Sequence, residues 1–82
     1  MNTALARLRA KTDRELSILI ARELRRSLAH ARQRNYPDAA SGYERARALL
    51  AAAEISHAER ASLERLLHEL RARIEQPASA VA

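Results

Sequence analysis

Apolar side chains recur every three or four positions along the first third of the chain, which is the spacing of one face of an α-helix. This face is formed by Leu5, Leu8, Leu16, Leu19 and Ile20. Most basic side chains of the segment lie on the opposite side, with Ile18 among them: Arg7, Lys11, Arg14, Arg22, Arg25 and Arg32. The pattern predicts an amphipathic helix over about residues 3–33 with a basic back. Thr12 and Glu15 also have capping-box spacing, which favours a second interpretation, a regular helix only from residue 13 onward.

A second helix is predicted over about residues 36–53. Asn35 suits the N-cap, Pro37 is tolerated in a first turn, and Asp38 suits the positive end of the helix dipole. The apolar side of this helix consists of Tyr36, Ala39, Tyr43, Ala46, Leu50 and Ala53. Gly42 lies in mid-helix, where glycine costs about 1 kcal/mol relative to alanine. We therefore expect another backbone to approach closely at Gly42.

A third helix is predicted over about residues 57–75, because Ser56 and Glu59 again have capping-box spacing. Its apolar stripe is the most regular of the chain and consists of Leu63, Leu66, Leu67, Leu70 and Ile74. Residues 76–82 contain Pro77 and no periodic pattern, so we expect a flexible C-terminal tail there.

The short breaks between these segments make consecutive helices antiparallel neighbours. Ala, Leu, Arg and Glu predominate, with one Gly and two Pro in 82 residues, which is typical of an all-α protein. The expected fold is a small three-helix up-down-up bundle, or a helical hairpin with a long first helix. Residues 1–75 are expected to form a single helical domain.

The predicted core is thin. Nineteen of the apolar residues are alanine, which leaves twelve Leu and four Ile as the main core formers, and Phe and Trp are absent. Scaffolds below about 80 residues commonly need a covalent staple, a metal or a partner. The chain has no cysteine, so it has no disulfide or thiolate metal site. We therefore expect association with a second copy or with another protein.

One segment resembles a known repeat. Tyr36, Ala39, Tyr43 and Ala46 are similar in order and spacing to the second helix of a tetratricopeptide repeat, a pair of helices with fixed small and large positions. Residues 20–33 would form the first helix of that repeat, but Glu23, Ser27 and His30 depart from its pattern. The resemblance covers about residues 20–50 and occurs once. It implies helix packing and a role in protein binding.

The function expected from these features is a non-enzymatic protein–protein interaction module, a small helical adaptor or chaperone-like subunit. Six residues are predicted to carry the association: Tyr36, Tyr43, Leu63, Leu66, Leu67 and Leu70. A simpler interpretation of the two tyrosines is that they seal a contact between helices.

Net charge favours an alternative from a different class. The chain carries +5, and its first 35 residues hold nine basic and three acidic side chains. A basic nucleic-acid-associated protein would contact phosphates through the first helix, with Arg22, Arg25, Arg26 and Arg32 as the candidates. A solvated basic face is the simpler interpretation, since no aromatic side chain lies within the stripe to stack on bases.

Chemistry at a catalytic or metal site is not expected. Glu23, Ser27 and His30 share one side of the first helix, but a polar flank explains them better than an acid–base pair. Glu64 and His68 lie one turn apart without a third metal ligand. We expect no cofactor and no metal. The longest apolar run is too short to span a membrane, so a cytoplasmic protein is expected.

Overall fold

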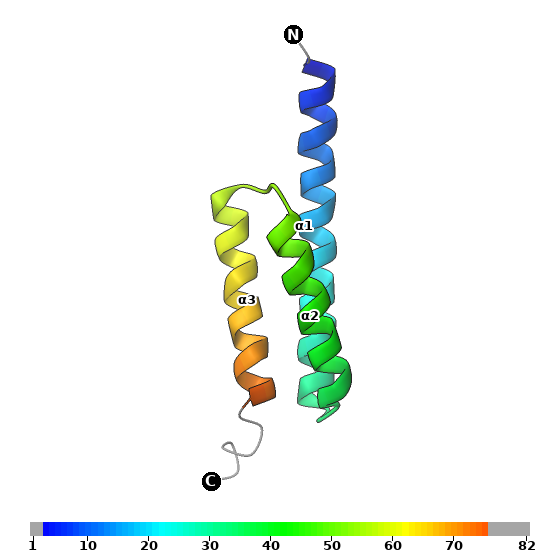
Figure 1. Ribbon diagram of the computed structural model, residues 1–82, viewed down its shortest axis with the longest axis vertical. Helices are drawn as coiled ribbons and strands as arrows, with labels where there is room; N and C mark the ends of the chain where they lie inside the picture. The colour runs from blue at the N-terminus through cyan, green and yellow to red at the C-terminus, as the bar shows by residue number, and fades with distance from the viewer. Residues whose placement is uncertain (1–2, 76–82) are drawn as a thin grey trace.

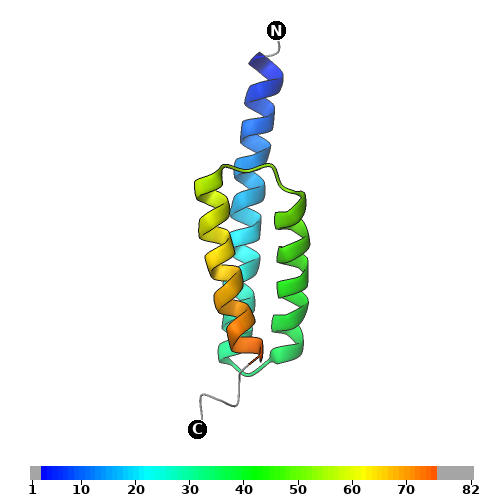
Figure 2. The same ribbon diagram turned by 60° about the vertical axis from the view of Figure 1, so that its left-hand side comes forward.

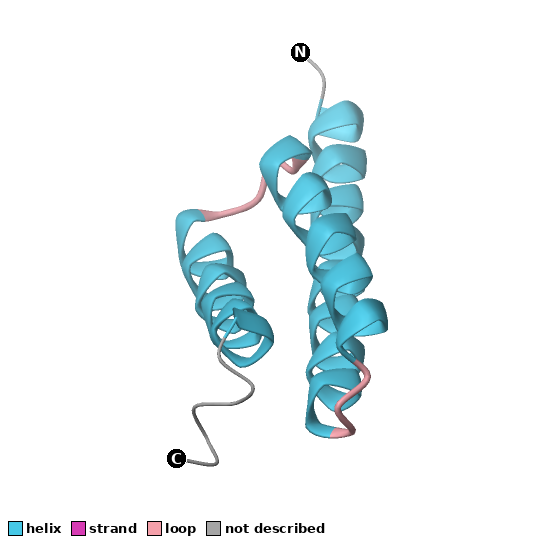
Figure 3. Ribbon diagram, turned by 60° about the horizontal axis from the view of Figure 1, so that its bottom comes forward, coloured by secondary structure: helices cyan, strands magenta, loops and turns pink. Residues whose placement is uncertain are grey.

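The computed structural model describes residues 3–75, and these form a small all-α bundle (Figure 1). The helices are α1 (Thr3–Arg32), α2 (Tyr36–Ala52) and α3 (His57–Glu75). They run up, down and up, and the two connections lie at opposite ends of the bundle (Figure 3). The predicted fold class is confirmed, and the helix bounds lie within one residue of those expected from the sequence. The expected C-terminal tail lies outside the described residues.

Helix α1 is continuous across Thr12, so the interpretation in which it begins at residue 13 is wrong. The Thr12 hydroxyl donates a hydrogen bond to the Leu8 carbonyl oxygen, 2.8 Å away, as an interior helix residue does. At about 1.5 Å per residue, α1 is about 45 Å long, whereas α2 is about 26 Å long. The N-terminal part of α1 therefore projects beyond the connection between α2 and α3 (Figure 2).

The core occupies only the part of α1 that the other helices reach. Helix α1 contributes the buried residues Ile20, Leu24, Leu28 and Ala31. The segment after α1 adds Ala39, Ala46, Leu50, Ala53, Leu63 and Leu70. Leu16 is the most N-terminal α1 residue packed against this cluster. Residues 3–15, hereafter the arm, contribute no described side chain to the core.

Two contacts between α1 and α2 set their register. A Cβ added at Gly42 would overlap Ser27 Oγ and lie 2.9 Å from Ser27 Cβ, so the expected close approach at Gly42 is present. One turn away, Glu23 Oε1 accepts from Arg45 Nε at 2.8 Å and lies 2.7 Å from Arg45 Nη2. The Glu23 side chain is only 18% exposed, and the pair therefore joins a half-buried carboxylate to a guanidinium at the surface.

The turn between α1 and α2 is a Schellman motif without glycine. Arg34 has a φ of 61°, a left-handed conformation that glycine adopts most easily. The Asn35 amide donates to the His30 carbonyl oxygen at 2.8 Å, and the Arg34 amide donates to that of Ala31 at 3.0 Å. These bonds satisfy two carbonyl groups at the end of α1. The Asn35 side chain does not cap α2; its Nδ2 donates instead to Asp38 Oδ2 at 2.7 Å.

The connection between α2 and α3 is held by the side chains of Ser56 and of Arg60 on α3. The Glu59 amide donates to Ser56 Oγ at 3.2 Å, so Ser56 caps α3 as its spacing predicts. The Arg60 guanidinium donates to the carbonyl oxygens of Leu50 at 3.0 Å and Ala53 at 2.6 Å. A cation from one helix thus completes the C-terminal end of another, where the helix dipole is negative.

We expect Arg34→Gly to stabilise the bundle. It relieves a left-handed strain of about 1–2 kcal/mol, while the added freedom of the unfolded chain costs about 0.4–1 kcal/mol. A net gain of about 0.5–1 kcal/mol should appear as a higher Tm in thermal unfolding. Gln33→Gly is the matched control, because Gln33 has no positive φ and should lose stability. A lower Tm for Arg34→Gly would contradict the assigned turn.

We expect Gly42→Ala to destabilise the bundle by about 1–2 kcal/mol, because overpacking costs about 1–3 kcal/mol and exceeds the helix-propensity gain of about 1 kcal/mol. Chemical denaturation measures the difference. The exposed neighbour Ser41 provides the control, since Ser41→Ala should change the free energy of unfolding by less than about 0.5 kcal/mol. Adding Ser27→Ala should recover part of the loss. A stabilising Gly42→Ala would mean that α1 and α2 are further apart than described.

Candidate functional site

The leucines predicted to bind a partner are divided between the core and its edge. Leu63 and Leu70 are 4% and 0% exposed and pack inside the chain, so they hold the bundle together instead of forming an association surface. Leu66 and Leu67 are half-buried and pack against the same core. Helix α3 therefore uses most of its regular leucine stripe within its own fold, which the stripe alone does not reveal.

The two tyrosines lie at the edge of α2 and are half-buried. Tyr43 packs against the core and lines a hollow of about 360 Å³ between α2 and α3. The other residues around this hollow are Ala40, Glu44, Arg47, Arg71, Ile74 and Glu75. The position of the Tyr43 ring is therefore explained by packing in the contact between helices, without a bound partner.

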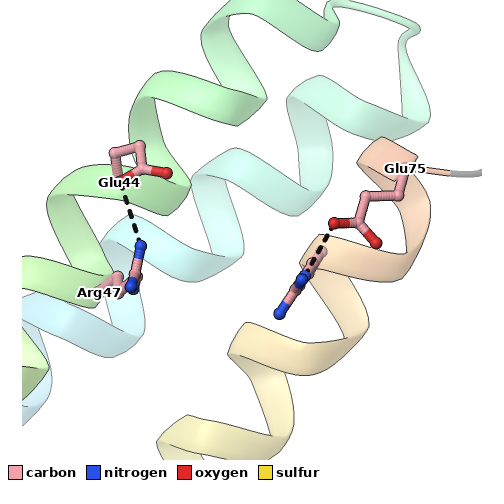
Figure 4. Close-up of polar contacts among 4 residues, drawn as sticks. Glu44, Arg47 and Glu75 are labelled. Carbon is pink, nitrogen blue, oxygen red and sulfur yellow. Dashed lines mark hydrogen bonds and ion pairs between the residues drawn. The ribbon is translucent and has the colours of Figure 1, made fainter.

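Two ion pairs, drawn in Figure 4, are formed by residues that line this hollow. Arg71 Nε lies 2.8 Å from Glu75 Oε1 on α3, and Arg47 Nη1 lies 3.8 Å from Glu44 Oε2 on α2. The Glu75 carboxylate, with a smaller effect of the nearby Tyr43 hydroxyl, raises the pKa of Arg71. Because each pair joins residues of the same helix and is exposed, it contributes little to stability. Each charged side chain that lines the hollow has an oppositely charged partner. The hollow therefore has no strong net electrostatic potential that would attract a small charged ligand.

Exposed large apolar side chains lie mainly on α1, with one on the adjoining part of α2. Leu5, Leu8 and Leu19 are 58%, 61% and 52% exposed, and Leu49 on α2 is 39% exposed. Leu19 and Leu49 each lie one helical turn from a member of the Glu23–Arg45 pair, in the same direction along the bundle. Because α1 and α2 are antiparallel, Leu19 and Leu49 lie at the same level. We call these four residues the leucine surface; sequence reasoning assigned three of them to the core-facing side of α1 and missed Leu49.

A row of cations follows another side of α1. Its members recur at helical spacing and are all exposed: Arg7, Lys11, Arg14, Arg22, Arg25 and Arg32. We call this set the basic row. Within residues 3–75, none of its side chains forms an ion pair. Ile18, 52% exposed, lies in the middle of the row, and Arg26 is exposed to one side of it.

Two of the polar residues weighed for chemistry have structural contacts. Glu23 pairs with Arg45, and Ser27, which is 1% exposed, packs against Gly42. Glu64 and His68 are exposed on α3. The described part of the chain contains no group of three His, Cys, Asp or Glu side chains that could hold a metal ion. It also contains no helix long and apolar enough to cross a membrane.

No protein-family model, curated protein or solved structure matches this chain. The fold adds nothing specific to the tetratricopeptide resemblance, which stays a prediction. Function therefore has to be inferred from the two surfaces of α1.

Proposed function

We propose that this protein is a non-enzymatic interaction module, a helical adaptor or chaperone-like subunit that binds a protein through the leucine surface. The partner is a second copy or a larger protein. The observation that carries the proposal is the exposure of four large apolar side chains on one side of the molecule. Complete burial of one leucine is worth about 1.5–3 kcal/mol. Covering the exposed part of four would therefore supply a substantial share of a binding free energy.

The arm supports the same proposal. It carries Leu5 and Leu8 beyond the bundle, where no described side chain of the protein covers them. Isolated helices shorter than about 12–15 residues are marginal in water, and no described side chain of the arm packs in the core. A partner packed along the arm would supply tertiary contacts to Leu5 and Leu8.

The basic row supports a second candidate, binding of nucleic-acid phosphates. Its members extend over about 38 Å of α1 at about 1.5 Å per residue. Their charges are not neutralised by ion pairs within residues 3–75. Three of the four arginines considered for phosphate contact belong to the row: Arg22, Arg25 and Arg32. Arg26 extends the basic surface toward the leucine surface.

For the interaction module, we expect Leu8→Glu to abolish binding to protein partners, because it places a charge in the apolar contact. Capture from native lysate with tagged wild-type and variant proteins, after nuclease treatment, measures this. Ile18→Glu is the matched control, since Ile18 is also exposed on α1 but lies in the basic row. Proteins that require Leu8 and tolerate Ile18→Glu are expected. If every captured protein is retained equally by both variants, the leucine surface is not the binding site.

For phosphate binding, we expect an affinity for DNA or RNA that falls steeply with salt. Replacing two contacting arginines in Arg22→Gln/Arg25→Gln should reduce the slope of log K against log salt by about 1.8 for duplex DNA. Arg65→Gln/Arg73→Gln on α3 removes the same charge and should leave the slope near its wild-type value. Titrations starting at about 50 mM salt provide the measurement. Absence of binding there, or equal slopes for the two double variants, would exclude the basic row as the contact.

A further inference from the structure

Four leucines of α1, two on the arm and two at the start of the bundle, are placed symmetrically about Thr12, and one of them, Leu16, also packs partly against its own core. Leu5 and Leu19 are each seven residues from Thr12, and Leu8 and Leu16 are each four residues from it. An antiparallel second α1 centred on Thr12 would therefore place Leu5 against Leu19 and Leu8 against Leu16, twice by symmetry. Such a self-complementary surface is what a twofold dimer interface requires.

Charges beside these positions favour the same arrangement. Lys11 and Glu15 are both exposed, one turn apart on one edge of the apolar positions. Within the described residues neither forms an ion pair. In an antiparallel pair centred on Thr12, Lys11 of one copy lies within about 3 Å, along the axis, of Glu15 of the other. A parallel pair in register would instead place Lys11 beside Lys11 and Glu15 beside Glu15.

Leu19 and Leu49 of the folded bundle are exposed on the side that this partner would cover. Leu49 lies at the level of Leu19, beside the position that Leu5 of the second copy would reach. The arm of each copy would then pack against the end of the other copy's bundle, where α2 stops. Apart from Lys11, the basic row lies on a different side of α1 and stays outside the contact. Leu5, Leu8 and Leu49, all exposed in the single chain, would thereby be covered.

We propose that the leucine surface binds a second copy of this chain, forming an antiparallel twofold dimer of α1 helices centred on Thr12. The inference rests on the proposed function, because it names the partner of the same surface. The dimer joins Leu5 of each copy to Leu19 and Leu49 of the other. Salt bridges between Lys11 and Glu15 fix its direction.

Sedimentation equilibrium of the full chain, from about 1 µM to about 1 mM, tests the dimer. We expect a monomer–dimer equilibrium that Leu8→Glu weakens by at least about tenfold, since two leucines are replaced by carboxylates in each dimer. Ile18→Glu should change the dissociation constant by less than about threefold. Glu15→Lys should weaken the dimer, and Lys11→Glu added to it should restore association. Circular dichroism of each variant confirms that the helices are intact.

Thiol cross-linking tests the direction of the pair, and the absence of native cysteine makes it unambiguous. Separately tagged Leu5→Cys and Leu19→Cys chains are mixed and treated with a short bismaleimide. An antiparallel dimer gives the mixed product between the two chains in excess. A predominance of products that join identical chains would overturn the proposed arrangement.

A chain that stays monomeric at about 1 mM would overturn the dimer, as would equal effects of Leu8→Glu and Ile18→Glu. Neither result would contradict the broader proposed function if the wild-type protein still captures a different protein that the Leu8→Glu variant does not. Conversely, failure of that capture together with a Leu8-dependent dimer would leave the second copy as the partner.

Discussion

The close approach of α1 and α2 at Ser27 and Gly42 is the contact on which the rest of the structure depends. Gly42 has no side chain and the Ser27 side chain fills the space that a Cβ would need, so the two helices are held in one register. The Glu23–Arg45 pair, one turn away, links the two helices in the same register. Given this register, the lengths of the helices determine which part of α1 is covered. Helix α2 ends after Ala52, close to the level of Leu16 on α1, and no described side chain before Leu16 belongs to the core.

The thin core and the projecting arm both reflect how the few large apolar residues of the chain are distributed. Alanines at Ala39, Ala46 and Ala53 allow close packing but bury little area each. The bundle therefore relies on a few large side chains, among them Leu24 and Leu70, both fully buried. Meanwhile five large apolar side chains among the described residues remain exposed, although a chain this small has few to spare. Four of them, Leu5, Leu8, Leu19 and Leu49, lie on one side of the molecule, and contiguous exposed apolar side chains are a common feature of protein interaction sites.

Most of the fold could be predicted from local sequence signals, and most of the errors concern contacts between segments. Helix bounds followed from periodicity, from the Ser56 cap and from the break at Asn35, and Gly42 correctly indicated close packing. The capping-box spacing at Thr12 misled, because a threonine hydroxyl satisfies its bonding equally well inside a helix by donating to the fourth residue before it. Leu63 and Leu70 were assigned to a partner although both are buried in the core, since periodicity shows that a face is apolar but not what covers it. The Arg60 contacts with the end of α2 depend on the tertiary fold, and no local pattern indicates them.

Apart from Lys11, the proposed dimer contact and the proposed phosphate contact use different sides of α1. In an antiparallel pair related by a twofold axis, the same edge of each helix lies on the same side of the pair. Lys11 and the basic row lie toward one edge of the leucine surface, whereas α2 and α3 lie toward the other. Dimerisation about Thr12 would therefore bring both basic rows to one face of the dimer, and α2 and α3 of both copies to the opposite face. The leucine surface would then act as the element that lengthens the basic face from about 38 Å to about 60 Å. Binding of an extended polyanion and self-association would be thermodynamically linked, each favouring the other, because a dimer offers a long anion more cations than a monomer does.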